Sequence, residues 1–187
     1  GNDLVLTVVK ITYGEDYSAW SYSKTFTLNT SITGANVLSN NANFPVLLRL
    51  NPGNFSYFSQ TLASGADIRF AKTNGVPLRY AIERWVDNTG DNDTAEIWVK
   101  IDTVYGNNST QSFKMYWGKS GAADSSKAGN VFDTSNGYIA TYFMNQSSGA
   151  AVDYTYNALN GTANGDVPRR QAGMVGYGQS LDGNGDY

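Results

Sequence analysis

Residues 65–85 read GADIRFAKTNGVPLRYAIERW, and they carry the clearest structural signal in the chain. Two short runs with strand-like alternation, 67–70 and 78–85, flank the dipeptide Asn74-Gly75. Asn-Gly tolerates the positive φ values that a type I′ turn demands at both central positions, and between apolar runs it is the strongest short-range hairpin signal. The stretch therefore predicts a β-hairpin.

The register of this hairpin determines which side chains share a face, because side chains along a strand alternate with a period of two. A strict two-residue loop places Arg69 opposite Tyr80 and Asp67 opposite Ile82. A slip of one residue would exchange every one of these partners.

A one-residue bulge near Pro77 gives the second register. Pro77 cannot donate a ladder hydrogen bond, which favours this bulged arrangement. The bulge brings four side chains onto one face, namely Asp67, Arg69, Glu83 and Trp85. The alternative interpretation of these charges is a structural arginine–carboxylate pair at a sheet edge, since ion pairs form in proteins without any function.

The composition excludes several classes of function. The formal net charge is −3 and the basic residues are scattered singly, so the chain lacks the basic patch that nucleic acid requires. It contains no Cys and no His, which rules out disulfides, thiolate metal sites, Ser-His-Asp systems and His-ligated zinc. The apolar runs are far too short for a membrane-spanning helix. Carboxylate chemistry is what remains for catalysis.

Strand-like segments recur along the rest of the chain. They are rich in β-branched and aromatic residues, are bounded by Gly- and Asn-rich turns, and cover residues 4–12, 20–28, 44–50, 94–102 and 112–118. Residues 54–63 form the better of two short helix candidates. We therefore expect an all-β fold with little helix, a two-layer antiparallel β-sandwich that is jelly-roll-like.

The 20–28 segment, WSYSKTFTL, is the most regular of these strands. Its alternation places Trp20, Tyr22 and Lys24 on one side and small polar residues on the other. The four tryptophans of the chain fall in four different segments, and burial of each indole is worth on the order of 2–3 kcal/mol. We expect most of them in the core.

Several short motifs follow one another in a characteristic order. They are Trp20-x-Tyr22, FPVLLRL at 44–50, GADIRF at 65–70, YAIERW at 80–85, IWVK at 97–100, MYWG at 115–118 and VFD at 131–133. In this order they resemble the bacterial and archaeal domain of unknown function 2341 family, over roughly residues 18–144. One departure is Trp117-Gly118-Lys119, where family members carry Tyr-Gly-Asn.

The C-terminal part of the chain has a different character. Apolar residues thin out after 145, and the segments 159–162, 172–174 and 180–183 are similar to the opening strands of a concanavalin A-like, laminin-G-type jelly roll. We therefore expect a β-sandwich module at 1–145, followed at 146–187 by a Gly-rich tail or the start of a second domain. The family resemblance implies a secreted or surface-displayed bacterial protein with further neighbouring domains.

A glycan-binding face is the function that the predicted hairpin favours. Sugars offer apolar C–H patches and many hydroxyls, so their sites combine flat aromatic platforms with a few fixed polar groups. The expected ligand-binding residues are Asp67, Arg69, Tyr80, Glu83, Trp85 and Trp98. The protein would then be a non-catalytic accessory module that binds a polysaccharide. Core packing is the alternative role for each of the aromatic residues.

Two acidic loops are candidates for a calcium ion, the one cofactor that the sequence suggests. Hard cations prefer oxygen ligands such as carboxylates and amide carbonyls. The first loop, taken as the metal site, contains Asp87, Asp91 and Asp93, and the second contains Asp182, Asn184 and Asp186. Neither loop has the EF-hand pattern, and solvated turns have the same composition.

Two further functions stay open at this point. A passive spacer or adhesion module that contacts protein needs no special residues. Glycoside hydrolysis needs two carboxylates, and Asp67 with Glu83 is the only pair that the predicted hairpin brings together. If both flank Arg69, however, they would be held ionised, whereas a general acid needs a pKa raised by burial. The sequence therefore favours binding over catalysis.

Overall fold

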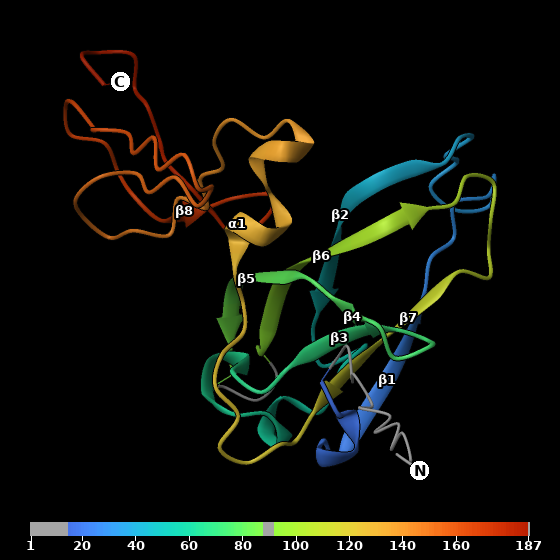
Figure 1. Cartoon of the computed structure of the whole chain (residues 1–187). Helices are drawn as coiled ribbons and strands as arrows, with labels where there is room; N and C mark the ends of the chain where they lie inside the picture. The colour runs from blue at the N-terminus through green and yellow to red at the C-terminus, as the bar shows by residue number, and fades with distance from the viewer. Residues whose placement is uncertain (1–14, 88–91, 187) are drawn as a thin grey trace, which may run out of the picture.

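The computed structural model describes residues 15–87 and 92–186 of the chain (Figure 1). Its strands form two antiparallel sheets, with strand orders β1-β7-β3-β4 and β2-β6-β5, and a separate two-stranded ribbon near the C-terminus. The strands are β1 Tyr22–Thr27, β2 Asn41–Leu50, β3 Arg69–Lys72, β4 Pro77–Leu78, β5 Tyr80–Val86, β6 Thr94–Val104, β7 Ser112–Trp117, β8 Gln171–Ala172 and β9 Tyr177–Gly178. The strand expected at 4–12 lies outside the described residues.

Within residues 15–87 and 92–186, helical structure is confined to short turns. These are α1 Ala128–Val131 and the 3₁₀ turns η1 Tyr17–Ala19, η2 Phe58–Gln60, η3 Ala63–Gly65 and η4 Thr134–Asn136. The helix expected at 54–63 is wrong, because this segment folds into separate turns that insert Phe55 and Phe58 into the core. Across the described parts of the chain, no helix has the length and apolar character that a membrane crossing requires.

The two sheets pack face to face around one hydrophobic core. Strand β6 shows how the sequence produces this arrangement, since every second residue, Ala95, Ile97 and Val99, is completely buried in this core. The opposing sheet contributes the buried side chains of Phe70, Phe113, Met115 and Trp117. The expected all-β, two-layer antiparallel sandwich is therefore confirmed.

The predicted hairpin exists, but its turn is of another type. Strand β3 pairs with β4, with Phe70 opposite Leu78. The Lys72 N–H donates to the carbonyl of Val76 at 2.8 Å, and within the turn Gly75, but not Asn74, has a positive φ, of 86°. The loop thus has three residues, 73–75, and its glycine is left-handed. The third loop residue shifts the strand pairing by one position relative to the strict two-residue loop, as the bulged register does.

The second arm of the hairpin does not continue along β3. After Leu78 the chain leaves the first sheet, and β5 pairs with β6 in the second sheet. A β-bulge then lies between Ile82 and Arg84, where two steps along β5 match one step along β6. Because of this bulge, Trp85 packs on the central core with Ile82, while Glu83 faces the other side of the sheet. The expectation that Glu83 and Trp85 share a face is therefore wrong.

The outer face of the second sheet is covered by a later part of the chain. There α1 packs on β5, and a second core forms from Ala81, Ala128, Val131, Phe132 and Phe143. Figure 1 shows this orange-to-red segment beyond α1, on the side away from β1 and β7. Phe143 stacks on Tyr154 across the expected boundary at 145, with ring centroids 4.6 Å apart. The division into 1–145 and 146–187 stays a prediction.

The carboxylate of Asp153 stabilises the backbone of this C-terminal region through hydrogen bonds. Its buried carboxylate accepts hydrogen bonds from the backbone N–H groups of Thr141, Thr155 and Leu159 at 2.8–2.9 Å. Burial alone would raise the pKa of Asp153, but these hydrogen bonds outweigh burial and lower the pKa to about 2. The ionised carboxylate thus joins the backbone at Thr141 to its own loop, residues 153–159.

The Asp153→Asn variant should be less stable than the wild type by about 1–2 kcal/mol near neutral pH. The folded pKa of about 2 lies below the ordinary value for an unfolded chain, about 3.9. The stabilisation is therefore complete above the unfolded pKa and is lost as the pH falls through the folded pKa. Urea unfolding near neutral pH and again between these two pKa values should show the wild-type advantage shrinking in acid. An advantage that does not depend on pH would contradict this role.

Candidate functional site

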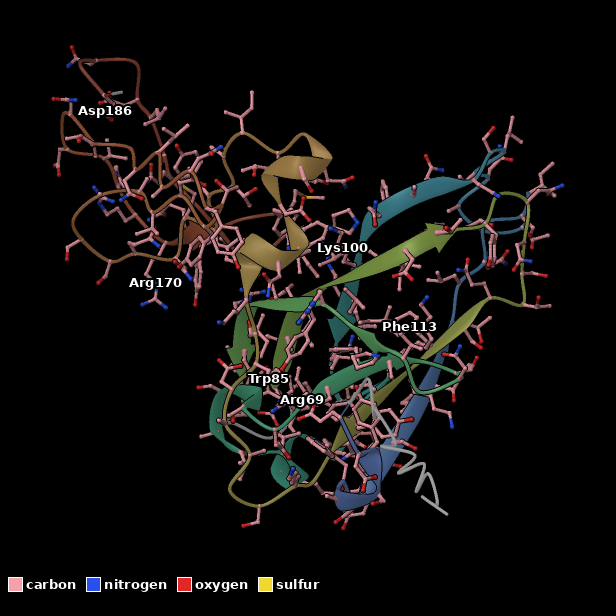
Figure 2. The ribbon with its side chains drawn as sticks, in the orientation of Figure 1. Arg69, Trp85, Lys100, Phe113, Arg170 and Asp186 are labelled. Carbon is pink, nitrogen blue, oxygen red and sulfur yellow. The ribbon has the colours of Figure 1, made fainter. Side chains whose placement is uncertain are left out.

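The six residues predicted to bind sugar do not share an open surface. Asp67, Arg69, Tyr80 and Glu83 are only 0–9 % exposed. Figure 2 shows Arg69 and Trp85 within the body of the sandwich. The expectation of a water-facing cluster is therefore wrong, and each residue has its own local packing role.

Asp67 is a fully buried anchor for two loops. One carboxylate oxygen accepts from the Leu62 N–H at 2.7 Å, and the other accepts from Gly118 at 2.6 Å and Lys119 at 3.2 Å. The backbone carbonyl of Asp67 accepts from the Trp20 indole at 2.7 Å. The carboxylate therefore holds the loop before β3 against the loop after β7.

Arg69 and Tyr80 form a second buried network. The guanidinium donates at 2.7–3.1 Å to three backbone carbonyls, those of Ala66, Ile68 and Ala123. Its Nε pairs with Glu15 at 2.9 Å. The Tyr80 hydroxyl donates to Ile68 at 2.7 Å, and burial raises the pKa of this hydroxyl far above its ordinary value. Arg69 thus forms a structural arginine–carboxylate pair, and its partner is Glu15.

Glu83 and Trp98 lie on the outer face of the second sheet, beneath the C-terminal segment. The Trp98 indole N–H donates to the Glu83 carboxylate at 2.6 Å. The backbone at Gly176 lies against this carboxylate, because a Cβ added there would be 2.3 Å from Oε1 of Glu83. Burial raises the pKa of Glu83, and the hydrogen bond from Trp98 partly offsets this effect. The pair is covered by the chain itself.

Trp85 belongs to the central core. Phe58 packs edge-on against its ring, with centroids 5.3 Å apart. Gly65 lies on the ring so closely that a Cβ there would be 2.7 Å from the indole. The indole N–H is buried and has no hydrogen-bond partner among the residues that the structure describes. These neighbours leave Trp85 without the open face that a sugar platform needs.

The acidic loops contain no preformed metal site within the described ranges, where no three metal-ligating side chains converge. Asp91 lies outside those ranges. Asp87 accepts a hydrogen bond from the Ser64 N–H, and Asp182 accepts one from the Asn184 N–H. Calcium at Asp87, Asp91 and Asp93 stays a prediction.

A groove that the sequence did not reveal lies beside the start of β1. Tyr22, Tyr57 and Trp117 line a cavity of about 490 Å³, which we call the tyrosine groove; its other lining residues are Ser21, Ser23, Lys24 and Gln60. Both tyrosine rings stack on Trp117, with centroid separations of 5.8 and 5.6 Å and interplanar angles of 26° and 24°. Tyr22 is 45 % exposed and Tyr57 is 42 % exposed, whereas Trp117 is buried. The groove therefore presents aromatic rings to water.

The rings of the tyrosine groove are held by backbone register and core packing. Tyr22 stands opposite Trp117 in the β1–β7 pair, so the two side chains share a face. Gly118, with φ 85°, lies so close that a Cβ there would be 2.6 Å from the Tyr22 ring. Phe55 packs edge-on against both Trp117 and Tyr57, at 5.1 and 5.7 Å.

Polar groups rim the tyrosine groove. The Gln60 side-chain oxygen accepts from the Trp117 indole N–H at 3.1 Å, which leaves the Gln60 amide nitrogen as a donor. The Lys24 ammonium donates to the carbonyl of Asn54 and carries two further N–H groups. The groove thus combines aromatic surface with hydrogen-bond donors.

The tyrosine groove continues into a second cavity of about 380 Å³. The two cavities share Ser21, Tyr22 and Gln60, and the second adds Lys119 and Asp67. Asp67 is thus the one predicted site residue that lines the second cavity. It acts there by fixing the loop of Lys119, because its carboxylate oxygens bind backbone N–H groups.

A separate cavity of about 430 Å³ lies at the opposite end of β1 and β7, beside the hairpin turn. Lys72 from the first sheet and Asp102 from the second form an ion pair at this cavity. Lys72 and Asp102 are already paired with each other. We therefore consider the tyrosine groove a better candidate ligand site than this cavity.

Comparison with known proteins identifies the family. A family model described as "Domain of unknown function (DUF2341)" matches residues 64–166, which is more than half of the 187-residue chain. The chain belongs to this family. No curated protein and no solved structure matches it.

The DUF2341 match confirms the resemblance that the order of motifs indicated, with different bounds. The match begins later than the expected residue 18 and continues beyond 144. It includes Trp117 and Gly118 but neither Tyr22 nor Tyr57, so the tyrosine groove joins matched and preceding segments. The similarity of the C-terminal segment to a concanavalin A-like jelly roll stays a prediction.

Proposed function

We propose that this DUF2341 protein is a non-catalytic accessory module that binds carbohydrate through the tyrosine groove. The observation that carries the proposal is the pair of exposed tyrosine rings, Tyr22 and Tyr57, stacked on buried Trp117. In this proposal the module belongs to a secreted or cell-surface bacterial protein and works beside neighbouring domains.

Tyr22 and Tyr57 have the properties that a sugar platform needs. The C–H face of a sugar ring packs on a flat aromatic ring, while its hydroxyls bond to neighbouring polar groups such as Lys24 and Gln60. Because Trp117 already fixes the tyrosine rings, little side-chain freedom is lost when a ligand binds.

The positions of the carboxylates support binding rather than hydrolysis. A glycosidase needs two carboxyl groups that flank one scissile bond. Among the described residues, the tyrosine groove has no acidic lining residue, and the carboxylate of Asp67 in the adjoining cavity is bound to three backbone N–H groups. Glu83 lies elsewhere, beneath Gly176. Asp67 and Glu83 are thus unsuited to act as an acid–base pair.

Affinity electrophoresis in gels loaded with different polysaccharides tests the proposal. At least one polymer should retard the wild type, and the Tyr57→Ala variant should bind that polymer roughly fivefold more weakly, because a stacked aromatic ring contributes about 1 kcal/mol. Tyr105→Ala is the matched control, since Tyr105 is 48 % exposed but lines the cavity at the opposite end. Unretarded migration of the wild type in every gel would overturn the proposal in favour of a passive spacer.

A further inference from the structure

We infer that the tyrosine groove selects anionic polysaccharides, bearing carboxylate or sulfate groups, over neutral ones. The inference rests on the proposed function and names the class of ligand that the groove takes. Its basis is the placement of two lysines, Lys24 and Lys119, along the groove.

Lys24 and Lys119 lie toward opposite ends of the continuous groove. Lys24 lines the first cavity, Lys119 lines the second, and Tyr22 lines both. Lys24 follows Tyr22 by two residues on β1, whereas the Lys119 ammonium lies 4.1 Å from the ring centroid of Trp20, which precedes Tyr22 by two residues. The two lysines therefore reach the groove on either side of Tyr22.

Neither lysine is engaged by a carboxylate in the described parts of the chain. The ion pairs found there use the side chains of Arg69, Lys72, Arg84 and Lys100. Lys24 donates to a backbone carbonyl and Lys119 faces an aromatic ring, so both ammonium groups keep N–H donors for a ligand.

Among the described residues that line the two cavities, Asp67 is the only acidic one beside the two lysines, and three backbone N–H groups bind its carboxylate. The groove is therefore locally positive on a chain whose net charge is −3.

Acidic sugar chains complement both the aromatic rings and the lysines of the groove. Their rings pack on Tyr22 and Tyr57, and their acid groups meet the lysines. A lysine ammonium is a compact charge with rotatable donors, so it accepts a carboxylate or a sulfate without the fixed fork geometry that arginine imposes. A neutral chain would offer the same lysines only hydroxyls, which form weaker hydrogen bonds than charged acceptors do.

Two matched pairs of polymers test the inference by affinity electrophoresis. One pair is polygalacturonate and its fully methyl-esterified form, and the other is dextran sulfate and dextran. The wild type should bind at least one charged polymer roughly threefold or more tightly than its neutral partner at low salt, and added NaCl should reduce this preference.

Lysine variants locate the preference in the groove. Lys24→Gln and Lys119→Gln should each weaken binding of the charged polymer roughly threefold and weaken binding of the neutral partner less, so that the preference for charge shrinks. Lys114→Gln is the matched control, because Lys114 lies between buried Phe113 and Met115 on β7 and so points to the outer face of the first sheet. It should bind every polymer as the wild type does.

The outcomes separate the inference from the proposed function. Preference for polygalacturonate alone identifies carboxylates, preference for dextran sulfate alone identifies sulfates, and preference for both identifies charge as the feature recognised. Equal binding within each pair would overturn the inference and leave sugar binding intact. Binding of charged polymers that survives Tyr57→Ala would also overturn it, as adsorption outside the groove. No retardation by any of the four polymers or by the wider panel would overturn the proposed function itself.

Discussion

Replacing Arg69 with methionine should lower the free energy of unfolding by about 3–5 kcal/mol. Methionine fills much of the same space, but it removes every donor from a buried site. The carbonyls of Ala66, Ile68 and Ala123 and the carboxylate of Glu15 would all lose the guanidinium. Each buried polar group left without a partner costs about 1–3 kcal/mol, although Ile68 keeps its bond from Tyr80. Urea unfolding followed by tryptophan fluorescence measures the loss.

Arg79→Met is the matched control for this substitution. Arg79 is exposed and lies where the chain passes from β4 to β5. Its replacement should change the free energy of unfolding by less than about 0.5 kcal/mol. A loss below about 1 kcal/mol for Arg69→Met would show that the buried network contributes little to the fold.

The Asp67→Asn substitution should destabilise the protein by about 2–4 kcal/mol. Both carboxylate oxygens accept backbone N–H groups, from Leu62 on one side and from Gly118 and Lys119 on the other. An asparagine amide can accept on one side only, so its NH₂ group would meet N–H donors on the other. Thermal and urea unfolding should both report the loss.

Asp67→Asn should also weaken sugar binding by the folded protein, because Gly118 and Lys119 line the groove. Asp102→Asn is the control, since Asp102 is exposed and pairs with Lys72 at the surface, and it should cost less than about 1 kcal/mol. Wild-type stability of Asp67→Asn would be incompatible with the anchoring role assigned to this carboxylate.

The sandwich was predictable because strands that bury one face repeat their apolar residues with a period of two. Ala95, Ile97 and Val99 show this pattern in the sequence and are completely buried in the structure. The Asn74-Gly75 turn was also predictable, because a turn signal depends only on neighbouring residues. Its type was not, because the three-residue loop uses positive φ at Gly75 alone.

The predicted sugar face failed because its residues depend on long-range geometry. Alternation within 78–85 suggests one continuous hairpin arm, but the chain changes sheets before Tyr80 and bulges near Glu83. The change of sheet separates Asp67 and Arg69 from the later residues, and the bulge separates Glu83 from Trp85. Local periodicity cannot detect either event. Both sheets of a sandwich bury aromatic residues, so the pattern of apolar residues looks the same before and after the chain changes sheets.

The tyrosine groove was missed for a related reason. Tyr22 and Tyr57 meet at Trp117, which is far from both in the sequence. The alternation of 20–28 did place Tyr22 and Lys24 on one side of a strand, and that was the one available signal. Only the β1–β7 register shows that this side opens to water where the strand begins.

The indole N–H signals of the four tryptophans in an NMR spectrum give the most direct test of where the ligand binds. Oligosaccharides from a polymer that retards the protein would be titrated into the wild type. The Trp117 signal should shift, because its N–H bonds to Gln60 in the wall of the groove, whereas the Trp98 signal should stay, because Trp98 bonds to Glu83 beneath the C-terminal segment. A shifting Trp98 signal beside an unchanged Trp117 signal would contradict the assignment of sugar binding to the tyrosine groove.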